Sequence, residues 1–516
     1  AASDVYKRQF HIPPEITNRG WFRNKLWLHC DQSFTDNQFK CIQSWVTGLD
    51  INENDGTLAI LEKSHHFHKD FGRDFEIKDR SNWYKLDTVE VDYFINNEDA
   101  INLVLYKDLK KPKFEAYMSE LGILISEINN VLKNLSKWSK PKKVRSSKLN
   151  FPSKDYIYYE PYGTVLVIAP WNYPFQLAIG PIITAIAAGN TVVLKPSEIS
   201  SNTAEIIKKI LSDIFEEEHV CVELGGVPET TALLKERWDY IFFTGSVAVG
   251  KIVAKAAAAH LTPVTLELGG KNPCIVDETA DLKLTAKRLV WGKFLNAGQT
   301  CIAPDYVLAK NQIKSDLIKY LKLEILKAYG VNPEISPNYP RIINMQNLQR
   351  LKDMLNDAEI LLGGNSNTKD NYLAPTLVNN PGLDSKIMAG EIFGPILPIL
   401  NYDNEKDIKL IISSFEKPLG FYIFSKDKRF CNSIITKYRF GGGAINDTMI
   451  HFGNPRLPFG GVGESGIGAY HGQFGYETFT HKKGITMKAN WLDIPLRYAP
   501  YKNKLKLLKK AFKWLG

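Results

Sequence analysis

The stretch Tyr240-Ile-Phe-Phe-Thr244-Gly-Ser-Val-Ala-Val-Gly250 joins a short, mostly apolar run to a small-residue turn and a helix-forming segment. Thr164-Val-Leu-Val-Ile-Ala169 and Thr191-Val-Val-Leu-Lys195 are followed by segments of the same kind. Apolar runs of this length are typical of parallel strands buried on both faces of a sheet. The repeated order of strand, turn and helix therefore predicts the βαβ units of a dinucleotide-binding sheet.

The chain after Cys301 repeats this alternation and predicts a second α/β domain. The expected strands cover 305–309, 394–400 and 420–424, and the expected helices cover 313–329 and 347–357.

Two further patterns lie ahead of the first apolar run. Apolar residues spaced mostly three and four apart, from Leu103 through Phe114 to Leu135, predict one amphipathic helix or a bent pair with these residues on its buried face. The alternation of bulky and polar residues over 151–159 predicts an exposed strand, either in a surface hairpin or in contact with another subunit.

A carboxylate and a thiol bracket the segment from Glu267 to Cys301. A thiolate attacks carbonyl carbon readily, and release of the resulting acyl group needs a water molecule activated by a base. Cys301 follows a small, polar, glycine-containing stretch suited to a tight loop, and Glu267 follows a strand-like run, 262–268. The pair is a candidate nucleophile and general base, whereas arbitrary Cys and Glu residues are usually core and surface positions.

Several segments resemble signature motifs of the aldehyde dehydrogenase superfamily. They are Pro170-Trp-Asn-Tyr-Pro174, Lys195-Pro-Ser-Glu198, Leu266-Glu-Leu-Gly-Gly270, Phe294-Leu-Asn-Ala-Gly-Gln-Thr-Cys301 and Glu391-Ile-Phe-Gly-Pro395. Residues 106–112 and 457–466 are most similar to the class 3, fatty-aldehyde branch. The resemblance runs from about Asn97 to the C-terminus and implies an aldehyde dehydrogenase fold that oxidises medium- or long-chain aliphatic or aromatic aldehydes to acids with NAD(P)⁺.

The resemblance also implies roles for the residues that match the motifs. Cys301 would form the thioester intermediate and Glu267 would activate water. Asn172, just beyond the apolar run 164–169, would donate a hydrogen bond to the oxyanion, although an Asn near Pro more often serves a turn.

The cofactor residues follow from the same motifs. Lys195 and Glu198 would hold the adenosine ribose, and a carboxylate there favours NAD, with NADP as an alternative. The turn that contains Gly245, Ser246 and Gly250 would face the pyrophosphate at a helix N-terminus, and Val247 stands where the family usually has Thr. Glu391 and Phe393 would hold the nicotinamide ribose and back its ring.

The composition excludes several classes of protein. The formal net charge is +9 over 516 residues, but six lysines without an acid lie in residues 501–516, so the rest is not a nucleic-acid-binding surface. Six scattered cysteines give no metal or disulfide pattern, which indicates a reducing compartment such as the cytoplasm. No apolar run reaches the ~18 residues of a membrane helix.

Residues 1–96 have a different composition, rich in His, Asp, Asn and aromatics. His29-Cys-Asp31 together with residues 54–65 resembles the phytanoyl-CoA dioxygenase family, whose members use iron and 2-oxoglutarate, but the remaining ligands are missing. We therefore expect a truncated, inactive all-β fragment and no metal site. Because the sequence begins Ala1-Ala-Ser-Asp and its first methionine is Met118, it is expected to be a fragment or a join of fragments.

The last residues form a basic amphipathic pattern, with Leu505, Leu508, Phe512 and Leu515 on one helical face. Such a helix can lie on an anionic membrane surface, or it can dock over the substrate mouth of its own or a partner subunit.

The patterns and the resemblance together divide the chain into five parts. They are the dioxygenase-like fragment (1–96), the NAD(P)-binding domain (97–150 and 164–270), the oligomerisation strands of an expected homodimer (151–163 and 476–490), the catalytic domain (271–475) and the tail (491–516). Three rival functions remain: a CoA-acylating dehydrogenase, disfavoured by Glu267, an iron dioxygenase and an inactive scaffold.

Overall fold

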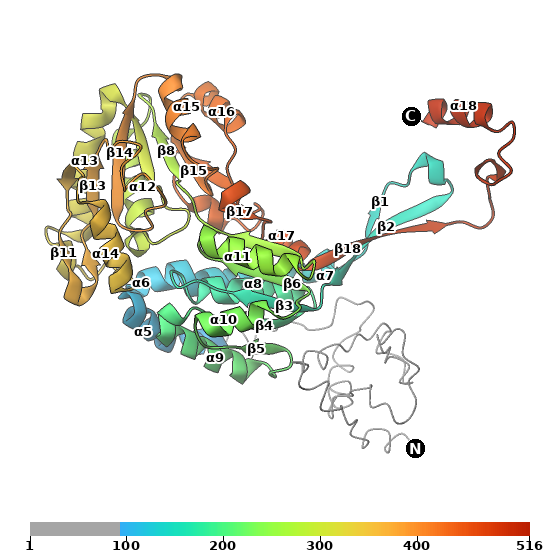
Figure 1. Cartoon of the computed structure of the whole chain (residues 1–516), viewed down its shortest axis with the longest axis horizontal. Helices are drawn as coiled ribbons and strands as arrows, with labels where there is room; N and C mark the ends of the chain where they lie inside the picture. The colour runs from blue at the N-terminus through green and yellow to red at the C-terminus, as the bar shows by residue number, and fades with distance from the viewer. Residues whose placement is uncertain (1–92, 516) are drawn as a thin grey trace, which may run out of the picture.

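The computed structural model describes residues 93–515. Two α/β lobes form the body of the molecule, and a long β arm leads away from it to the C-terminal helix (Figure 1). The prediction for residues 1–96, including the His29 and Asp31 pattern, lies outside the described residues except for 93–96. Those four residues are helical, and Phe94 packs edge-on against Phe175 with ring centroids 5.7 Å apart.

The first lobe is built on a six-stranded sheet. Its strands, in spatial order, are β17 (Gly466–Ile467), β7 (Val264–Glu267), β6 (Tyr240–Thr244), β3 (Thr164–Ile168), β4 (Thr191–Lys195) and β5 (Val220–Val222). All neighbours are parallel except β17 and β7. The chain reverses its direction of progress across the sheet between β3 and β6, and such a switch point is where open α/β sheets bind ligands.

Helices cover both faces of this sheet, which explains why the strands are continuous apolar runs. Val165 and Val167 of β3 point into the main core, whereas Leu166 and Ile168 point into a second core with Val253. The helices of this lobe are α5 (Glu98–Leu109), α6 (Lys113–Ala116), α7 (Gly122–Trp138), α8 (Gln176–Ala187), α9 (Ser201–Ile214), α10 (Val227–Leu234), α11 (Val247–Ala258) and α17 (Gly472–Thr478).

The second lobe contains a seven-stranded sheet. Its spatial order is β10 (Ile360–Leu362), β13 (Thr376–Asn379), β14 (Ile396–Tyr402), β9 (Tyr306–Lys310), β8 (Pro273–Val276), β15 (Gly420–Phe424) and β16 (Gly442–Ile445), with only β10 antiparallel to its neighbour. Its helices are α12 (Leu282–Phe294), α13 (Asn311–Tyr329), α14 (Met345–Met354), α15 (Glu405–Ser413) and α16 (Lys428–Lys437), and β11 (Ser366–Asn367) and β12 (Tyr372–Leu373) form a small hairpin. The second α/β domain expected from the sequence is confirmed.

The expected amphipathic helix before the first sheet is broken into several segments. The chain leaves the helix at Lys110, resumes at α6 after Pro112 and passes through a π-helical turn (η3, Tyr117–Leu121) into α7. The prediction that Leu103 and Phe114 lie on a buried face was wrong, since they are 55% and 80% exposed. A single helical period cannot be extrapolated through Pro112, because proline lacks the amide hydrogen needed for a continuous helix.

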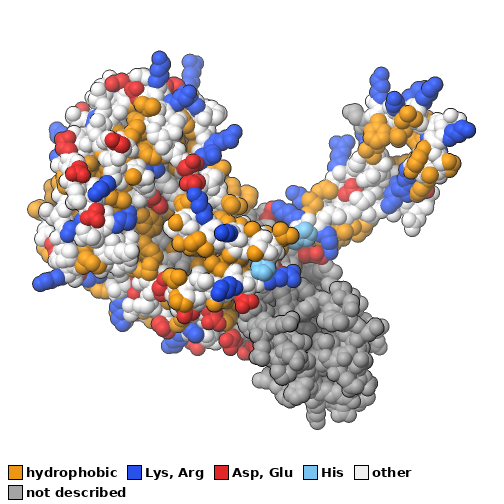
Figure 2. Space-filling view, viewed as in Figure 1, with side chains coloured by type: hydrophobic (Ala, Val, Ile, Leu, Met, Phe, Trp, Pro, Cys, Tyr) orange, Lys and Arg blue, Asp and Glu red, His pale blue; other side chains and the backbone are white. Residues whose placement is uncertain are grey.

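The arm is an antiparallel sheet of β1 (Lys142–Val144), β2 (Ser153–Pro161) and β18 (Thr480–Lys488). The alternation over 151–159 correctly predicted the strand β2, but β2 lies between β1 and β18 and is mostly half-buried, so the prediction that it is exposed was wrong. Beyond it, α18 (Leu505–Leu515) lies at the far end of the arm (Figure 1), so it does not dock over the body of its own chain. Figure 2 shows hydrophobic and basic side chains side by side over this end. In residues 93–515, no helix has both the length and the apolar character needed to cross a bilayer.

Candidate active site

Asn172 lies in the loop directly after β3, at the switch point of the six-stranded sheet. Its side chain is buried and its Nδ2 donates a hydrogen bond of 3.0 Å to the carbonyl of Gln299. In return, Asn296 Nδ2 donates to the Asn172 carbonyl at 2.7 Å. Two loops that are more than a hundred residues apart in sequence are thereby fastened side by side.

The loop before Cys301 has an unusual backbone. Asn296 and Ala297 have φ of 52° and 51°, and Gly298 follows with φ of 75°. Left-handed conformations are unfavourable for residues with a Cβ and persist only where surrounding contacts enforce them. Gly298 is required for a second reason, because a Cβ on it would come within 2.3 Å of the Gly394 carbonyl oxygen.

Gln299 holds this loop from inside. It is fully buried, its Nε2 donates to the carbonyls of Asn296 and Arg341 at 3.0 and 2.9 Å, and its Oε1 accepts the N–H of Ile343 at 3.0 Å. Asn272 adds a contact on the other side, donating to the Cys301 carbonyl at 2.7 Å. Gln299 was present in a motif and Asn272 lies two residues after another, but their residue types alone gave no sign of these roles.

Cys301 is partly exposed as a residue, but its sulfur is buried, and two of the predicted acids act on it. Burial of the sulfur, then the charge of Glu391 and then that of Glu267 raise the pKa of the thiol. Hydrogen bonding from the backbone N–H groups of Cys301 and Ile302 acts in the opposite direction and lowers the pKa of the thiol. The thiol therefore lies where carboxylates and backbone donors converge.

Glu267 is the last residue of β7 and is 2% exposed. Neither carboxyl oxygen has a hydrogen-bond partner among the described residues, and burial raises the pKa of the group well above its usual range. A buried acid without partners is rare in structures and is more common at functional sites than elsewhere.

Glu391 and Phe393 approach the same region from the second lobe. The Glu391 carboxyl accepts a hydrogen bond from the Gly270 N–H, and burial followed by the charge of Asp305 raises its pKa to about 8. Phe393 packs edge-on against Trp171, the residue before Asn172, with ring centroids 5.4 Å apart. These two motif residues therefore flank the segments that contain Glu267 and Asn172.

Lys195 and Glu198 lie at the carboxyl end of β4, apart from Cys301. Lys195 is buried, its Nζ donates to the Pro196 carbonyl at 2.6 Å, and it lies 3.7 Å from the half-exposed carboxylate of Glu198. Burial lowers the pKa of Lys195, and the neighbouring Glu198 opposes this.

The turn after β6 brings α11 close to the sheet. Ser246 caps the helix by accepting the N–H of Val249, and its neighbour Gly245 has no room for a Cβ, which would meet the Phe243 ring at 2.5 Å. A Cβ on Gly250 would lie 2.7 Å from Leu268. The α11 N-terminus therefore opens at the same edge of the sheet as Asn172, and its glycines allow close packing.

A sequence profile described as the aldehyde dehydrogenase family matches residues 85–485. The chain belongs to the aldehyde dehydrogenase family. It is 49% identical over 418 residues to a 4,4'-diaponeurosporen-aldehyde dehydrogenase of Staphylococcus aureus, covering 81% of this chain and 91% of the relative. It is 44% identical over 392 residues to aldehyde dehydrogenase family 3 member A2 of Macaca fascicularis, covering 76% of this chain and 81% of the relative.

Solved structures agree with this assignment. A substrate-bound Staphylococcus aureus AldH superposes with a TM-score of 0.82 at 46% identity and covers 88% of this dehydrogenase and 100% of that chain. A Mycobacterium tuberculosis aldehyde dehydrogenase complexed with NAD⁺ gives 0.71 at 26% identity, covering 78% of this chain and 84% of that one. The protein is an NAD(P)-dependent enzyme that oxidises aldehydes to carboxylic acids, and its relatives include class 3 members.

The comparisons leave one expectation without support. The profile match begins at residue 85, inside the range 1–96 that resembles a dioxygenase fragment, and the relatives named above give that resemblance no support. Within residues 93–515 no three or more His, Cys, Asp or Glu side chains are grouped as metal ligands.

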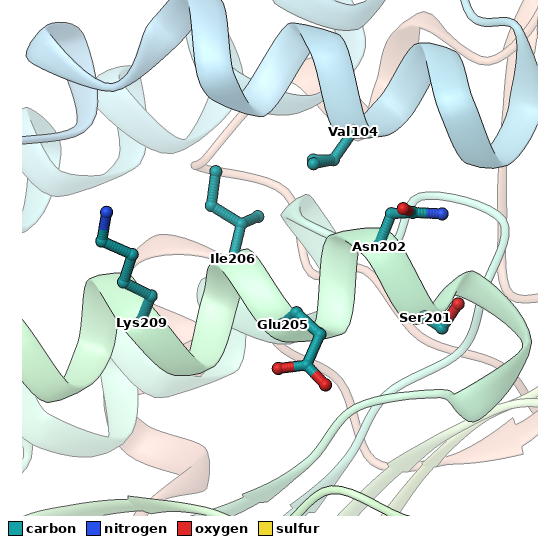
Figure 3. Close-up of a pocket in the computed structure, with 6 residues that line it drawn as sticks. All are labelled: Val104, Ser201, Asn202, Glu205, Ile206 and Lys209. Carbon is teal, nitrogen blue, oxygen red and sulfur yellow. The ribbon is translucent and has the colours of Figure 1, made fainter.

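An open groove of about 630 Å³ between α5 and α9 lies outside the dehydrogenase site (Figure 3). It is lined by Val104, Ser201, Asn202, Glu205, Ile206 and Lys209, and none of these residues was predicted to act in catalysis. One of these lining residues, Asn202, donates a hydrogen bond to Asp108 of α5.

Proposed function

We propose that Cys301 is the nucleophile of this dehydrogenase, that Asn172 and the Cys301 N–H stabilise the oxyanion, and that Glu267 is the general base. The observation that carries the proposal is the convergence on one thiol of two acids and two backbone donors, beside a loop bonded to Asn172. A thiol, an amide and an acid in one site are what acyl chemistry on sulfur requires.

In the attack step, Cys301 gives its proton to a water molecule, and its sulfur forms a bond to the aldehyde carbon. The carbonyl π electrons move to oxygen, where one N–H of Asn172 remains for hydrogen bonding because the amide nitrogen carries two hydrogens and only one is given to Gln299. NAD(P)⁺, when bound, supplies the acceptor for the hydride that leaves this carbon.

The product of that oxidation is a thioester on Cys301. Glu267 then takes a proton from water, the hydroxide oxygen adds to the acyl carbon, and the C–S bond breaks to release the carboxylic acid and the thiolate. Because burial raises the pKa of Glu267, it is a stronger base than an exposed carboxylate once it is ionised. Activity should accordingly rise with pH as this proton is lost.

The residues at the edge of the six-stranded sheet fit a dinucleotide. The N-terminus of α11 at Gly245, Ser246 and Gly250 suits a pyrophosphate, and the Lys195 and Glu198 pair suits a ribose with free hydroxyls. Glu391 would hold the second ribose and Phe393 would back the nicotinamide ring. The carboxylate of Glu198 favours NAD, with NADP as an alternative, because it would repel a 2′-phosphate.

The decisive test is Cys301→Ser with a medium-chain aldehyde and NAD⁺. We expect NADH formation to fall at least about a thousandfold, because a serine hydroxyl is a far weaker nucleophile than a thiolate. Cys221→Ser is the matched control, since Cys221 is also free and partly exposed but lies at β5. Undiminished turnover in Cys301→Ser would refute the assignment, and a dependence on added CoA would indicate an acylating enzyme instead.

We also propose the five-part domain division given above for this dehydrogenase. The two sheets support it, because β3 to β7 fall in 164–270 and β8 to β16 in 271–475. The segment 466–478 is an exception because it packs on the first lobe, where β17 pairs with β7 and α17 contacts α7 and α8. Limited proteolysis should therefore cut before residue 466 or after 478 and leave this segment with the first lobe.

The homodimer and the membrane contact are proposals that rest on the arm. β18 is an edge strand of nine residues with an exposed surface, which suits pairing with a second subunit and is tested by sedimentation. On α18, Leu505, Leu508 and Phe512 are exposed among lysines, which suits an anionic lipid surface. Flotation with phosphatidylserine vesicles, lost on deletion of 504–516, tests the contact. The described cysteines are free, and we propose a cytoplasmic location.

A further inference from the structure

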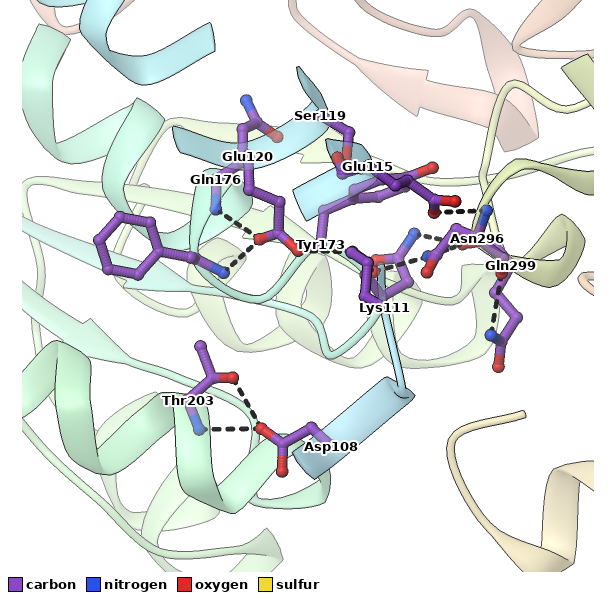
Figure 4. A network of polar contacts seen from close by, with 12 residues as sticks. Asp108, Lys111, Glu115, Ser119, Glu120, Tyr173, Gln176, Thr203, Asn296 and Gln299 are labelled. Atoms are coloured by element: carbon purple, nitrogen blue, oxygen red, sulfur yellow. Dashed lines mark hydrogen bonds and ion pairs between the residues drawn. The ribbon is translucent and has the colours of Figure 1, made fainter. Parts of the chain in front are cut away.

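The segment 108–120, which runs from the end of α5 through α6 into η3, contacts both lobes. Its first anchor is Asp108, which accepts hydrogen bonds from the Thr203 N–H and hydroxyl at 2.8 and 2.6 Å (Figure 4). Asp108 also accepts from Asn202 Nδ2 at 2.7 Å. These donors lie in the first turn of α9, where an anionic acceptor is favourable. The segment is thereby fixed to the first lobe.

A buried ion pair forms the centre of the segment. Lys111 and Glu120 are both fully buried and lie 2.5 Å apart. Glu120 also accepts the N–H groups of Phe175 and Gln176 at 2.9 and 3.1 Å, at the start of α8. A buried charge pair is stable only when its remaining hydrogen-bonding capacity is filled in this way.

Lys111 connects the pair to the Asn172 loop. Its Nζ donates to the Asn172 carbonyl at 3.3 Å and lies 4.4 Å from the centre of the Tyr173 ring. Tyr173 in turn shares a 2.6 Å hydrogen bond with Thr300, the residue before the thiol. The ion pair therefore reaches the two loops that flank the site.

Glu115 makes the direct contact with the nucleophile loop. Its Oε1 accepts the backbone N–H of Asn296 at 2.8 Å, and Figure 4 shows it facing Asn296 from the opposite side to Gln299. Asn296 opens the left-handed run described above. On the second lobe, the Arg341 N–H donates to the Leu109 carbonyl at 2.8 Å, and the Arg341 carbonyl accepts from Gln299.

We propose that residues 108–120 form a brace that sets the backbone of loop 295–301, and that Glu115 is its positioning residue for Cys301. The inference deepens the proposed function and rests on it for the role of Cys301. The physical reason is that the left-handed run is unfavourable by itself, so it needs an acceptor fixed independently of the loop. Glu115 is fixed in that way, because the brace is anchored at Asp108, Lys111 and Glu120.

The strength of this contact should depend on pH. Burial raises the pKa of Glu115 to about 7, against the lowering effects of Lys111 and of the Asn296 N–H, while Glu120 raises it further. The other titratable groups that face it are the phenols of Tyr173, Tyr329 and Tyr339, whose pKa values its charge helps to raise. An ionised carboxylate accepts more strongly than a protonated one, so the brace should tighten as pH rises through about 7.

The test compares Glu115→Gln and Glu115→Leu with Asp99→Asn in the full-length enzyme. Asp99 is an exposed acid of α5 paired with Lys113, so its loss should change little. We expect Glu115→Gln to lower kcat about tenfold, as for loss of one charge-assisted hydrogen bond, with the KM for NAD⁺ unchanged. Glu115→Leu should lower kcat further. In the wild type, ionisation of Glu115 should contribute to the change in kcat between pH 6 and 8, and this contribution should be absent from both variants.

A second measurement is independent of catalysis. Hydrogen exchange of peptide amides across 295–301 should be faster in Glu115→Gln than in the wild type at the same pH, and unchanged in Asp99→Asn. Wild-type exchange or wild-type kcat in Glu115→Gln would overturn the proposal, as would an equal loss of NAD⁺ affinity, which would assign the contact to the cofactor lobe. If Glu115→Leu fails to fold, the glutamine variant still decides. Failure of the proposed function would show separately, as full turnover in Cys301→Ser with the exchange effect intact.

Discussion

The two sides of the site differ in how their polar groups are paired. On the loop side, both Gln299 Nε2 hydrogens and its Oε1 are used, and the amides of Asn172 and Asn296 donate across to each other's loops, although the buried Asn296 Oδ1 has no partner among the described residues. On the strand side, Glu267 is equally buried but neither carboxyl oxygen has a partner among the described residues. Gln299 lies two residues before Cys301, and Glu267 raises the pKa of the Cys301 thiol.

The difference follows from what each side has to do. A group that positions others must stay in one place, and several hydrogen bonds in a low-dielectric interior give it a single conformation. A group that exchanges protons must be able to exist in two protonation states, so permanent donors would oppose its task by lowering its pKa. Glu115 belongs to the first kind despite its charge, since its acceptor oxygen is occupied by Asn296.

The largest effect is expected from Glu267→Gln, which removes the unpaired acid while keeping its shape. Steady-state turnover should fall by about 10²–10⁴, the usual contribution of a general base. A burst of NADH close to one per site should remain, because hydride loss precedes hydrolysis. Stopped-flow absorbance measures both phases, with the exposed Glu205→Gln on α9 as control. Equal loss of the burst and of the steady-state rate would assign Glu267 to the attack step. It would contradict the view that Glu267 differs from the paired side because it activates water.

Asn172→Ala removes a group from the paired side. We expect kcat to fall by about 10²–10³, as for loss of one oxyanion donor. NAD⁺ binding, followed by fluorescence, should stay unchanged. Asn129→Ala is the control, since its amide only bonds within α7 at an exposed position. An unchanged kcat would show that the bond to Gln299 is the whole role of Asn172.

The smallest effect on activity is expected from Glu127→Gln, which tests an unpaired acid in the first lobe. Glu127 is 8% exposed, its Oε1 has no partner among the described residues, and burial raises its pKa to about 8. The folded state therefore binds this proton more tightly than the unfolded chain does, and stability falls as pH rises from the usual value towards 8.

Replacing Glu127 by the neutral amide should remove that loss. Above pH 8 the variant should be more stable than the wild type by on the order of a few kcal/mol, and near pH 5 the two should be alike. Thermal melts at pH 5, 7 and 9 measure the difference. If the wild type and Glu127→Gln melt at the same temperature at pH 9, the unpaired buried acid costs no stability here. The contrast between Glu267 and the paired side would then be weaker.

Local pattern predicted the strands well where the sheet is buried on both faces. The strands 191–195, 240–244 and 420–424 were predicted to the residue, because continuous apolar runs have clear ends. The prediction was poor around Leu103 and Phe114, where a break at Pro112 resets the helical phase. The motif residues were found by resemblance, but the brace was not. In the sequence Glu115 is an ordinary acid of a helical segment, and only the structure shows that it accepts the Asn296 N–H.

By itself, the sequence determined the two α/β lobes and the family of this enzyme, through the order of its apolar runs, glycine turns and motif residues. Strand burial and close backbone approach depend on residues that are neighbours in the sequence. The tertiary structure alone decided which buried polar groups are paired. Glu115 meets a backbone N–H 181 positions away, while Glu267 meets no described partner. Hydrogen bonding of that kind depends on the relative placement of distant segments, and no local spacing records it.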